Sequence, residues 1–221
     1  MTTSSDTPTV PPGLSDDASA EASARGPVPR GEARGARLLS DVGEPRNWML
    51  VLTPLFGWRA AGPAGLGWGM FAAVFTAVLP TLILHLGERR RWWRDRRMRR
   101  RQDRLLAAPA VLTSVLAGAV PLYVYEAPVP VSAFVTAMVA VLLALLPVTF
   151  FWKVSVHSAV ASGALAVLAA EFGPWALVTA PLVVLIGWSR VRLRCHTPGQ
   201  VAVGLLIGAA VGAPVHAILS R

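Results

Sequence analysis

One short stretch, residues 188–200, combines side chains that could do chemistry. Arg190, Arg192, Arg194 and His196 lie there between two long apolar runs. Charged groups are costly inside a bilayer, so an ionisable cluster at the edge of apolar segments is a candidate functional site. Guanidinium groups bind phosphate through paired hydrogen bonds, and imidazole can act as a nucleophile or proton carrier near neutral pH. This combination at a membrane surface indicates chemistry on the phosphate of a lipid.

Two further polar stretches interrupt the apolar sequence. Residues 152–158 hold Lys153, Ser155 and His157, and residues 88–104 hold most of the net positive charge of the chain. Two apolar runs separate each polar stretch from the next. An even number of membrane crossings returns the chain to the same face, so we expect all three stretches to meet at one membrane surface.

The composition predicts a membrane protein. Of 221 residues, 54% are hydrophobic, and the mean hydropathy is +0.53. These values predict an all-α, polytopic membrane helical bundle of about six transmembrane helices. The net charge of +9 is concentrated in the arginine block, so nucleic acid is not expected as a partner. The single cysteine, Cys195, excludes an internal disulfide and a cysteine-based metal cluster, and neither a metal nor another cofactor is expected.

The chain divides into a tail and a membrane domain. Residues 1–46 are rich in small and polar residues and are predicted to be disordered, whereas residues 47–221 form the membrane-embedded domain. The apolar stretch 48–58 is short for a hydrocarbon core of about 30 Å, so an interfacial segment, a re-entrant segment and a strained span all stay open. Further apolar runs are expected to form helices at 66–86, 105–125, 131–151, 159–170, 175–187 and 201–219.

The spacing of the third polar stretch resembles a known motif. Ser189-Arg190 is followed after five residues by His196 and after three more by Gln200. This pattern resembles the last signature of the type-2 phosphatidic acid phosphatase superfamily of lipid phosphate phosphatases, Ser-Arg, five residues, His, three residues, Asp. The final acid of that signature is replaced here by Gln200.

The other two signatures of this family are present in altered form. Its Pro-Ser-Gly-His motif resembles residues 154–157, which keep Ser155 and His157. Its first motif, Lys, six residues, then Arg-Pro, resembles Arg97 and Arg104, with arginine in place of lysine and no proline after Arg104. The resemblance covers residues 97 to about 210, and the three motifs follow the family's order.

The resemblance implies a role for each matching residue. His196 would attack phosphorus and form a phosphohistidine, and His157 would act as general acid and then as general base. Gln200 would orient His196 by accepting a hydrogen bond from its ring. The remaining residues would bind the phosphate; they are Arg190, Arg97, Arg104, Ser155, Lys153 and Ser189. No metal is required, because arginine supplies the positive charge.

The implied substrate is a lipid phosphate, either a polyprenyl phosphate or diphosphate or phosphatidic acid, and membrane lipids are the other expected partners. A catalytically degenerate protein that binds anionic lipid headgroups is the alternative, favoured by the loss of the acid, the glycine and both prolines. A small transporter is a third possibility, but no pair of discontinuous helices supports it. The arginine block predicts a multi-pass protein of the cell membrane with its site on the cytoplasmic face.

Overall fold

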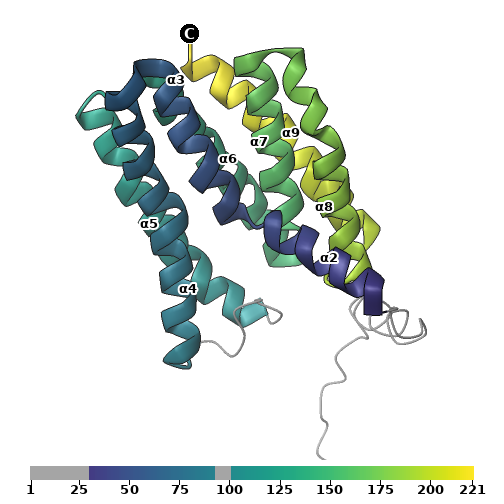
Figure 1. Ribbon diagram of the computed structural model, residues 1–221. Coiled ribbons are helices and arrows are strands. Elements are labelled where there is room, and N and C mark those ends of the chain that lie inside the picture. Colours follow the sequence, from purple (N-terminus) through teal and green to yellow (C-terminus); the bar gives the residue numbers. More distant parts are fainter. Residues whose placement is uncertain (1–29, 93–100) are drawn as a thin grey trace, which may run out of the picture.

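The fold is an all-α bundle, as the sequence predicts. A computed structural model describes residues 30–92 and 101–221, and these residues contain helices and no strand (Figure 1). Among the described residues, five segments are long and apolar enough to cross a membrane, so the chain is a multi-pass membrane protein. They are Pro45–Arg89, Leu106–Val124, Val129–Thr149, Pro174–Arg192 and Pro198–Leu219.

The described elements follow one another along the chain. In chain order they are α2 (Arg30–Val42), α3 (Pro45–Ala73), a π-helical segment (Val74–Val78), α4 (Leu79–Arg89), α5 (Arg101–Val124), α6 (Val129–Phe151), α7 (Val156–Phe172), a 3-10 segment (Pro174–Thr179), α8 (Ala180–Arg192) and α9 (Pro198–Leu219). Helix α7 is apolar but, at 17 residues, shorter than the five candidate spans.

Helix α3 contains a tight helical hairpin. The backbone leaves helical geometry at Gly62, whose φ of +56° is a left-handed value that glycine adopts without strain. A Cβ atom on Gly57 would lie 2.1 Å from the carbonyl oxygen of Gly65, and one on Gly69 would lie 2.3 Å from that of Thr53. The pairing of 57 with 65 and 53 with 69 is antiparallel. The stretch 48–58 is therefore the first arm of this hairpin, packed directly against the second.

Helix α2 corrects the prediction of disorder up to residue 46. Residues 30–42 form a helix that packs against α8, while residues 1–29 lie outside the described part. Ala36 is fully buried in this contact, and Gly43 lies against the side chain of Ile186. The helix was missed because its buried face consists of small residues, which give no hydrophobic signal in the sequence.

Helices α7 and α9 contact each other at backbone distance. Gly204, Gly208 and Gly212 recur every four residues and therefore form one face of α9. A Cβ atom on Gly208 would lie 2.0 Å from the carbonyl oxygen of Ala159, and one on Gly204 would lie 2.6 Å from that of Ser155. Small residues allow membrane helices to approach this closely. The contact fixes the first turn of α7 beside the first turn of α9.

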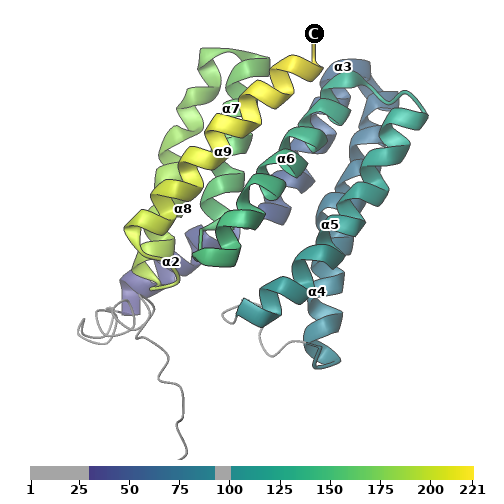
Figure 2. The same cartoon turned by 180° about the vertical axis from the view of Figure 1, so that it is seen from behind.

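The polar stretches lie at one end of the bundle, as the even number of crossings predicts. The start of α7, the α8–α9 connection, the end of α4 and the start of α5 are all at the end where α2 lies, and the C-terminus is at the other (Figures 1 and 2). Arg97 lies outside the described residues. Arg104 is described only as backbone in the first turns of α5.

Candidate functional site

The loop between α8 and α9 folds back onto the last turn of α8. The backbone N–H groups of Cys195 and His196 both donate to the carbonyl oxygen of Arg190, at 3.0 and 3.2 Å. Arg194 adopts a φ of +54°, which turns the chain at this point. The five-residue interval between Arg190 and His196 therefore forms a compact turn that holds the two residues close together.

Two hydrogen bonds join this loop to the connection between α6 and α7. Lys153 Nζ donates to the carbonyl oxygen of Cys195 at 2.7 Å, across 42 residues of sequence. The backbone N–H of Ser155 donates to the carbonyl oxygen of Gln200 at 3.3 Å. The second and third polar stretches are thus held side by side, and Lys153 contributes a link between them.

His157 lies in the first turn of α7, outside the five candidate spans, and is half-buried. Its pKa is lowered from the ordinary value, first by burial, then by the positive charge of Arg190 and by electrostatic interaction with His196. The hydrogen bonds of Lys153 and Ser155 place the start of α7, where His157 lies, beside the loop that holds His196. At neutral pH the imidazole of His157 is uncharged and can accept a proton.

The two serines predicted to bind phosphate form hydrogen bonds with helices α7 and α8. Ser155 is fully buried and caps α7, because its Oγ accepts from the N–H of Ser158 at 3.3 Å and lies 2.9 Å from Ser158 Oγ. Ser189 is also fully buried, and its hydroxyl donates to the carbonyl oxygen of Ile186 at 2.7 Å. These bonds give both hydroxyls partners within the fold.

Gln200 has a different partner from the one predicted. Its side-chain oxygen accepts from the backbone N–H of Thr197 at 3.1 Å, and its own N–H donates to Thr197 Oγ1 at 3.3 Å. This reciprocal pair is a capping box at the start of α9, with Pro198 in the first helical position. Gln200 therefore holds the backbone of Thr197, the residue after His196, in place. The signal was present in the sequence as Thr-Pro-Gly-Gln, the pattern of a capped helix start.

Arg190 has a partner that sequence reasoning missed. Its Nη1 donates to Ser40 Oγ in α2 at 2.6 Å, and the neighbouring Arg192 forms an ion pair with Glu32 of the same helix. Ser40 is 150 residues away along the chain. No local pattern connects residues so distant, so only the packing of α2 on α8 reveals this contact.

The site is rich in positive charge. Arg190 and Lys153 lie on the segments just described, and the N-termini of α7 and α9 add the partial positive charge of their helix dipoles. Among the described residues, no group of three or more His, Cys, Asp or Glu side chains could hold a metal ion. The arrangement is suited to bind an anion next to two imidazoles.

A separate polar cluster lies at the opposite end of the bundle. His216 is 1% exposed, and its Nε2 lies 3.2 Å from Glu171 Oε2. Arg59 Nε lies 3.8 Å from Glu171 Oε1, and its guanidinium is 5.0 Å from the ring centre of Phe172. The cluster joins α3, α7 and α9. The sequence assigned no role to His216.

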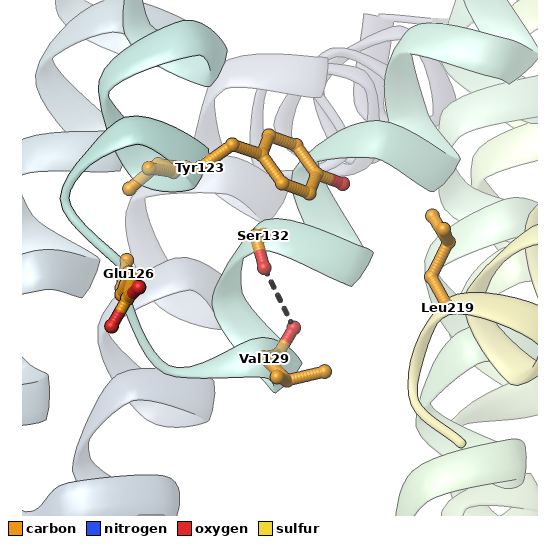
Figure 3. Close-up of a pocket in the computed structure, with 7 residues that line it drawn as sticks. Tyr123, Glu126, Val129, Ser132 and Leu219 are labelled. Atoms are coloured by element: carbon orange, nitrogen blue, oxygen red, sulfur yellow. Dashed lines mark hydrogen bonds between the residues drawn. The ribbon is translucent and has the colours of Figure 1, made fainter.

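A pocket of about 290 Å³ also lies at this opposite end (Figure 3). It is formed by the α5–α6 connection and the last turn of α9, with Tyr123, Glu126 and Leu219 in its lining. Two of its hydroxyls have partners, since Ser132 Oγ donates to the carbonyl oxygen of Val129 at 3.1 Å and Tyr123 pairs with Thr136 at 2.7 Å. None of the predicted site residues lines it.

No family model, no curated protein and no solved structure matches this chain. Its chemistry is therefore inferred from the residues at the arginine-rich end of the bundle.

Proposed function

We propose that this chain is a membrane lipid phosphatase that removes phosphate from a lipid phosphate through a phosphohistidine. One observation carries the proposal. Hydrogen bonds from Lys153 to Cys195 and from Ser155 to Gln200 join the connection before His157 to the loop that holds Arg190 and His196, at one end of a membrane bundle. A nucleophile, a proton carrier and a fixed cation are the groups that phosphoryl transfer to an imidazole requires.

The reaction proceeds in two displacements. A ring nitrogen of His196 attacks phosphorus, the bond from phosphorus to the lipid oxygen breaks, and the leaving alkoxide takes a proton from His157. Arg190 stabilises the negative charge on the non-bridging oxygens, with Arg97 and Arg104 as further proposed cations. A water molecule then gives its proton to His157 and attacks the phosphohistidine. Inorganic phosphate leaves, and His196 is regenerated.

The low pKa of His157 sets a condition on the first step. His157 is neutral in the free protein at pH 7, so it must gain a proton before it can protonate the leaving group. A phosphate dianion beside Arg190 offsets one of the positive charges that lower this pKa. Substrate binding and protonation of His157 are therefore coupled in the proposed mechanism, because the phosphate charge favours the protonated imidazole.

The proposed substrates are polyprenyl phosphates or diphosphates and phosphatidic acid, because their charged groups reach the membrane surface while their tails stay in the bilayer. We place the site on the cytoplasmic face of the cell membrane. This assignment rests on the arginines between residues 89 and 104, which far exceed the needs of one phosphate.

A binding protein for anionic lipid headgroups is the second candidate. Gln200 supports it, because an amide engaged in a capping box supplies no negative charge to stabilise a cationic histidine. Such a protein would keep the arginines and lose turnover.

Phosphate release by the purified full-length protein, measured on a panel of these lipids, separates the two functions. The variants are His196→Ala and, as a matched control, His85→Ala in α4. We expect phosphate release and acid-labile phosphate on the protein for the wild type and for His85→Ala, and background release with no acid-labile phosphate for His196→Ala. Equal release by His196→Ala would exclude the mechanism. If the protein retains anionic lipid but releases phosphate from none of the lipids, the second candidate, a lipid-binding protein, would be established.

A further inference from the structure

The connection between α6 and α7 carries exposed apolar side chains beside the loop that holds His196. Phe151 is 92% exposed, Trp152 is 42% exposed and Val156 is 36% exposed. The same connection contains Lys153, which joins it to the α8–α9 loop. Sites for small ligands combine a few polar groups with apolar side chains that contact the rest of the ligand. These three side chains are therefore placed to contact the apolar part of a molecule whose polar group binds at the loop.

Trp152 has the closest connection to that loop. The Cη2 atom of its indole would lie 3.6 Å from a Cβ atom on Gly199, in the first turn of α9. The next residue, Lys153, donates to the carbonyl oxygen of Cys195 at 2.7 Å. The two contacts fall on either side of His196 in the chain, one residue before it and three residues after it. The indole is thus held beside the loop of His196 while much of its surface stays exposed.

Trp152 and His196 lie just outside the candidate spans. Trp152 follows the span Val129–Thr149, and His196 lies between the spans Pro174–Arg192 and Pro198–Leu219. Tryptophan suits this level of a membrane, because its ring is apolar and its N–H is polar. A lipid phosphate must rise to the level of His196 to react, and the first carbon atoms of its chain rise with it. Those carbons then need an apolar surface at an otherwise polar end of the bundle.

We propose that Trp152 binds the carbon atoms of the lipid next to the phosphate, and that it makes the site favour phosphate attached to an apolar chain over soluble phosphate. Phe151 and Val156 extend this apolar surface on either side. The inference rests on the proposed function and names a residue that determines its specificity. The contact involves a part of the substrate that does not react, so it stabilises the bound substrate and the transition state equally. Its loss therefore raises KM and leaves kcat unchanged.

The test uses full-length protein in lipid nanodiscs, a lipid phosphate that the wild type hydrolyses, and inorganic phosphate as a competitive inhibitor without a chain. Trp152→Ala removes the apolar ring, Trp152→Phe keeps one, and Trp188→Leu alters a tryptophan of α8 with a similar exposure of 44%. We expect Trp152→Ala to raise KM for the lipid roughly tenfold, with kcat and the Ki of inorganic phosphate unchanged. Trp152→Phe keeps most of the affinity for the lipid, and Trp188→Leu matches the wild type.

The controls separate this role from a structural one. If Trp152 only supports the loop through Gly199, Trp152→Ala changes kcat and Ki as well as KM, and the inference is overturned. An equal rise in KM for Trp188→Leu would indicate a general interfacial anchor and would overturn it too. An active wild type with unchanged KM in Trp152→Ala would overturn it and leave the proposed function intact.

Two further arrangements keep the test decisive. If Trp152→Ala does not fold, Trp152→Gln replaces it, because glutamine keeps bulk against Gly199 without an apolar ring. If the wild type binds lipid phosphate without turnover, the Kd values for the lipid and for inorganic phosphate replace KM and Ki. In that case the inference stands only if Trp152→Ala weakens binding of the lipid alone. A wild type that neither releases phosphate nor binds these molecules would overturn both the inference and the proposed function.

Discussion

Gly208→Ala tests the contact on which the site depends. The added Cβ atom would lie 2.0 Å from the carbonyl oxygen of Ala159 and 2.3 Å from Ser162 Oγ. An ordinary contact needs more than 3 Å, so α9 must move away from α7 by over 1 Å, because a backbone carbonyl cannot turn aside. Overpacking of this kind costs about 3 kcal/mol, and the helix propensity of alanine returns about 1 kcal/mol. We expect a net loss of about 2 kcal/mol and a fall in Tm of roughly 4–8 °C.

The assay is thermal unfolding of the purified protein in detergent, followed by intrinsic tryptophan fluorescence. Gly67→Ala is the matched control, because nothing lies within 4 Å of its Cβ position and the residue is exposed. We expect this variant to be as stable as the wild type or slightly more stable, by up to about 1 kcal/mol. A Tm for Gly208→Ala at or above the wild-type value, with Gly67→Ala unchanged, would refute the close packing of α7 on α9.

Three further predictions concern titration, the distant polar cluster and the helix cap. The unfolded chain takes up a proton at His157 near pH 6.5 while the folded chain does not, so wild-type stability should fall by up to about 2 kcal/mol between pH 6.5 and 5. His157→Asn should lose less over this range in pH-dependent melting curves, and parallel curves would contradict the prediction. Glu171→Gln should destabilise the protein by roughly 1–3 kcal/mol because the buried ring of His216 loses its carboxylate partner. The same change at the exposed Glu126 should not, and equal melting of the two variants would count against the cluster. Gln200→Glu should keep the Tm of the wild type, whereas Gln200→Ala should lower it, because the protein loses about 1 kcal/mol of folding free energy with the cap. The reverse order of Tm values would exclude the capping box.

The helices and their arrangement at the site were largely predictable from the sequence. Long apolar runs can satisfy their backbone groups in a bilayer only as helices, so hydropathy predicts the bundle. The even number of runs between the polar stretches then predicts that His157 and Arg190 lie at the same end. The short interval between Arg190 and His196 keeps these two close together in any fold.

Other features depend on contacts that hydropathy does not record. The glycines at 57, 65 and 69 make the α3 hairpin through backbone contact, yet in the sequence they resemble ordinary small residues of an apolar run. Helix α2 was interpreted as disordered because Ala36 and Ser40 bury little apolar surface. The partner of Arg190 could not be predicted for the same reason, since it belongs to that helix.

The capping box changes how the replacement of the expected acid should be interpreted. A Gln at this position accepts the same backbone hydrogen bond that caps the helix, so the turn that follows His196 keeps its geometry without a carboxylate. The position of that turn is fixed independently by two main-chain contacts, from Ser155 to Gln200 and from Gly204 to Ser155. What the replacement removes is negative charge near a histidine that would become cationic during the reaction. Changes at Gln200 that keep the cap should therefore alter the rate of phosphate release with little effect on Tm, whereas changes that break the cap should alter both.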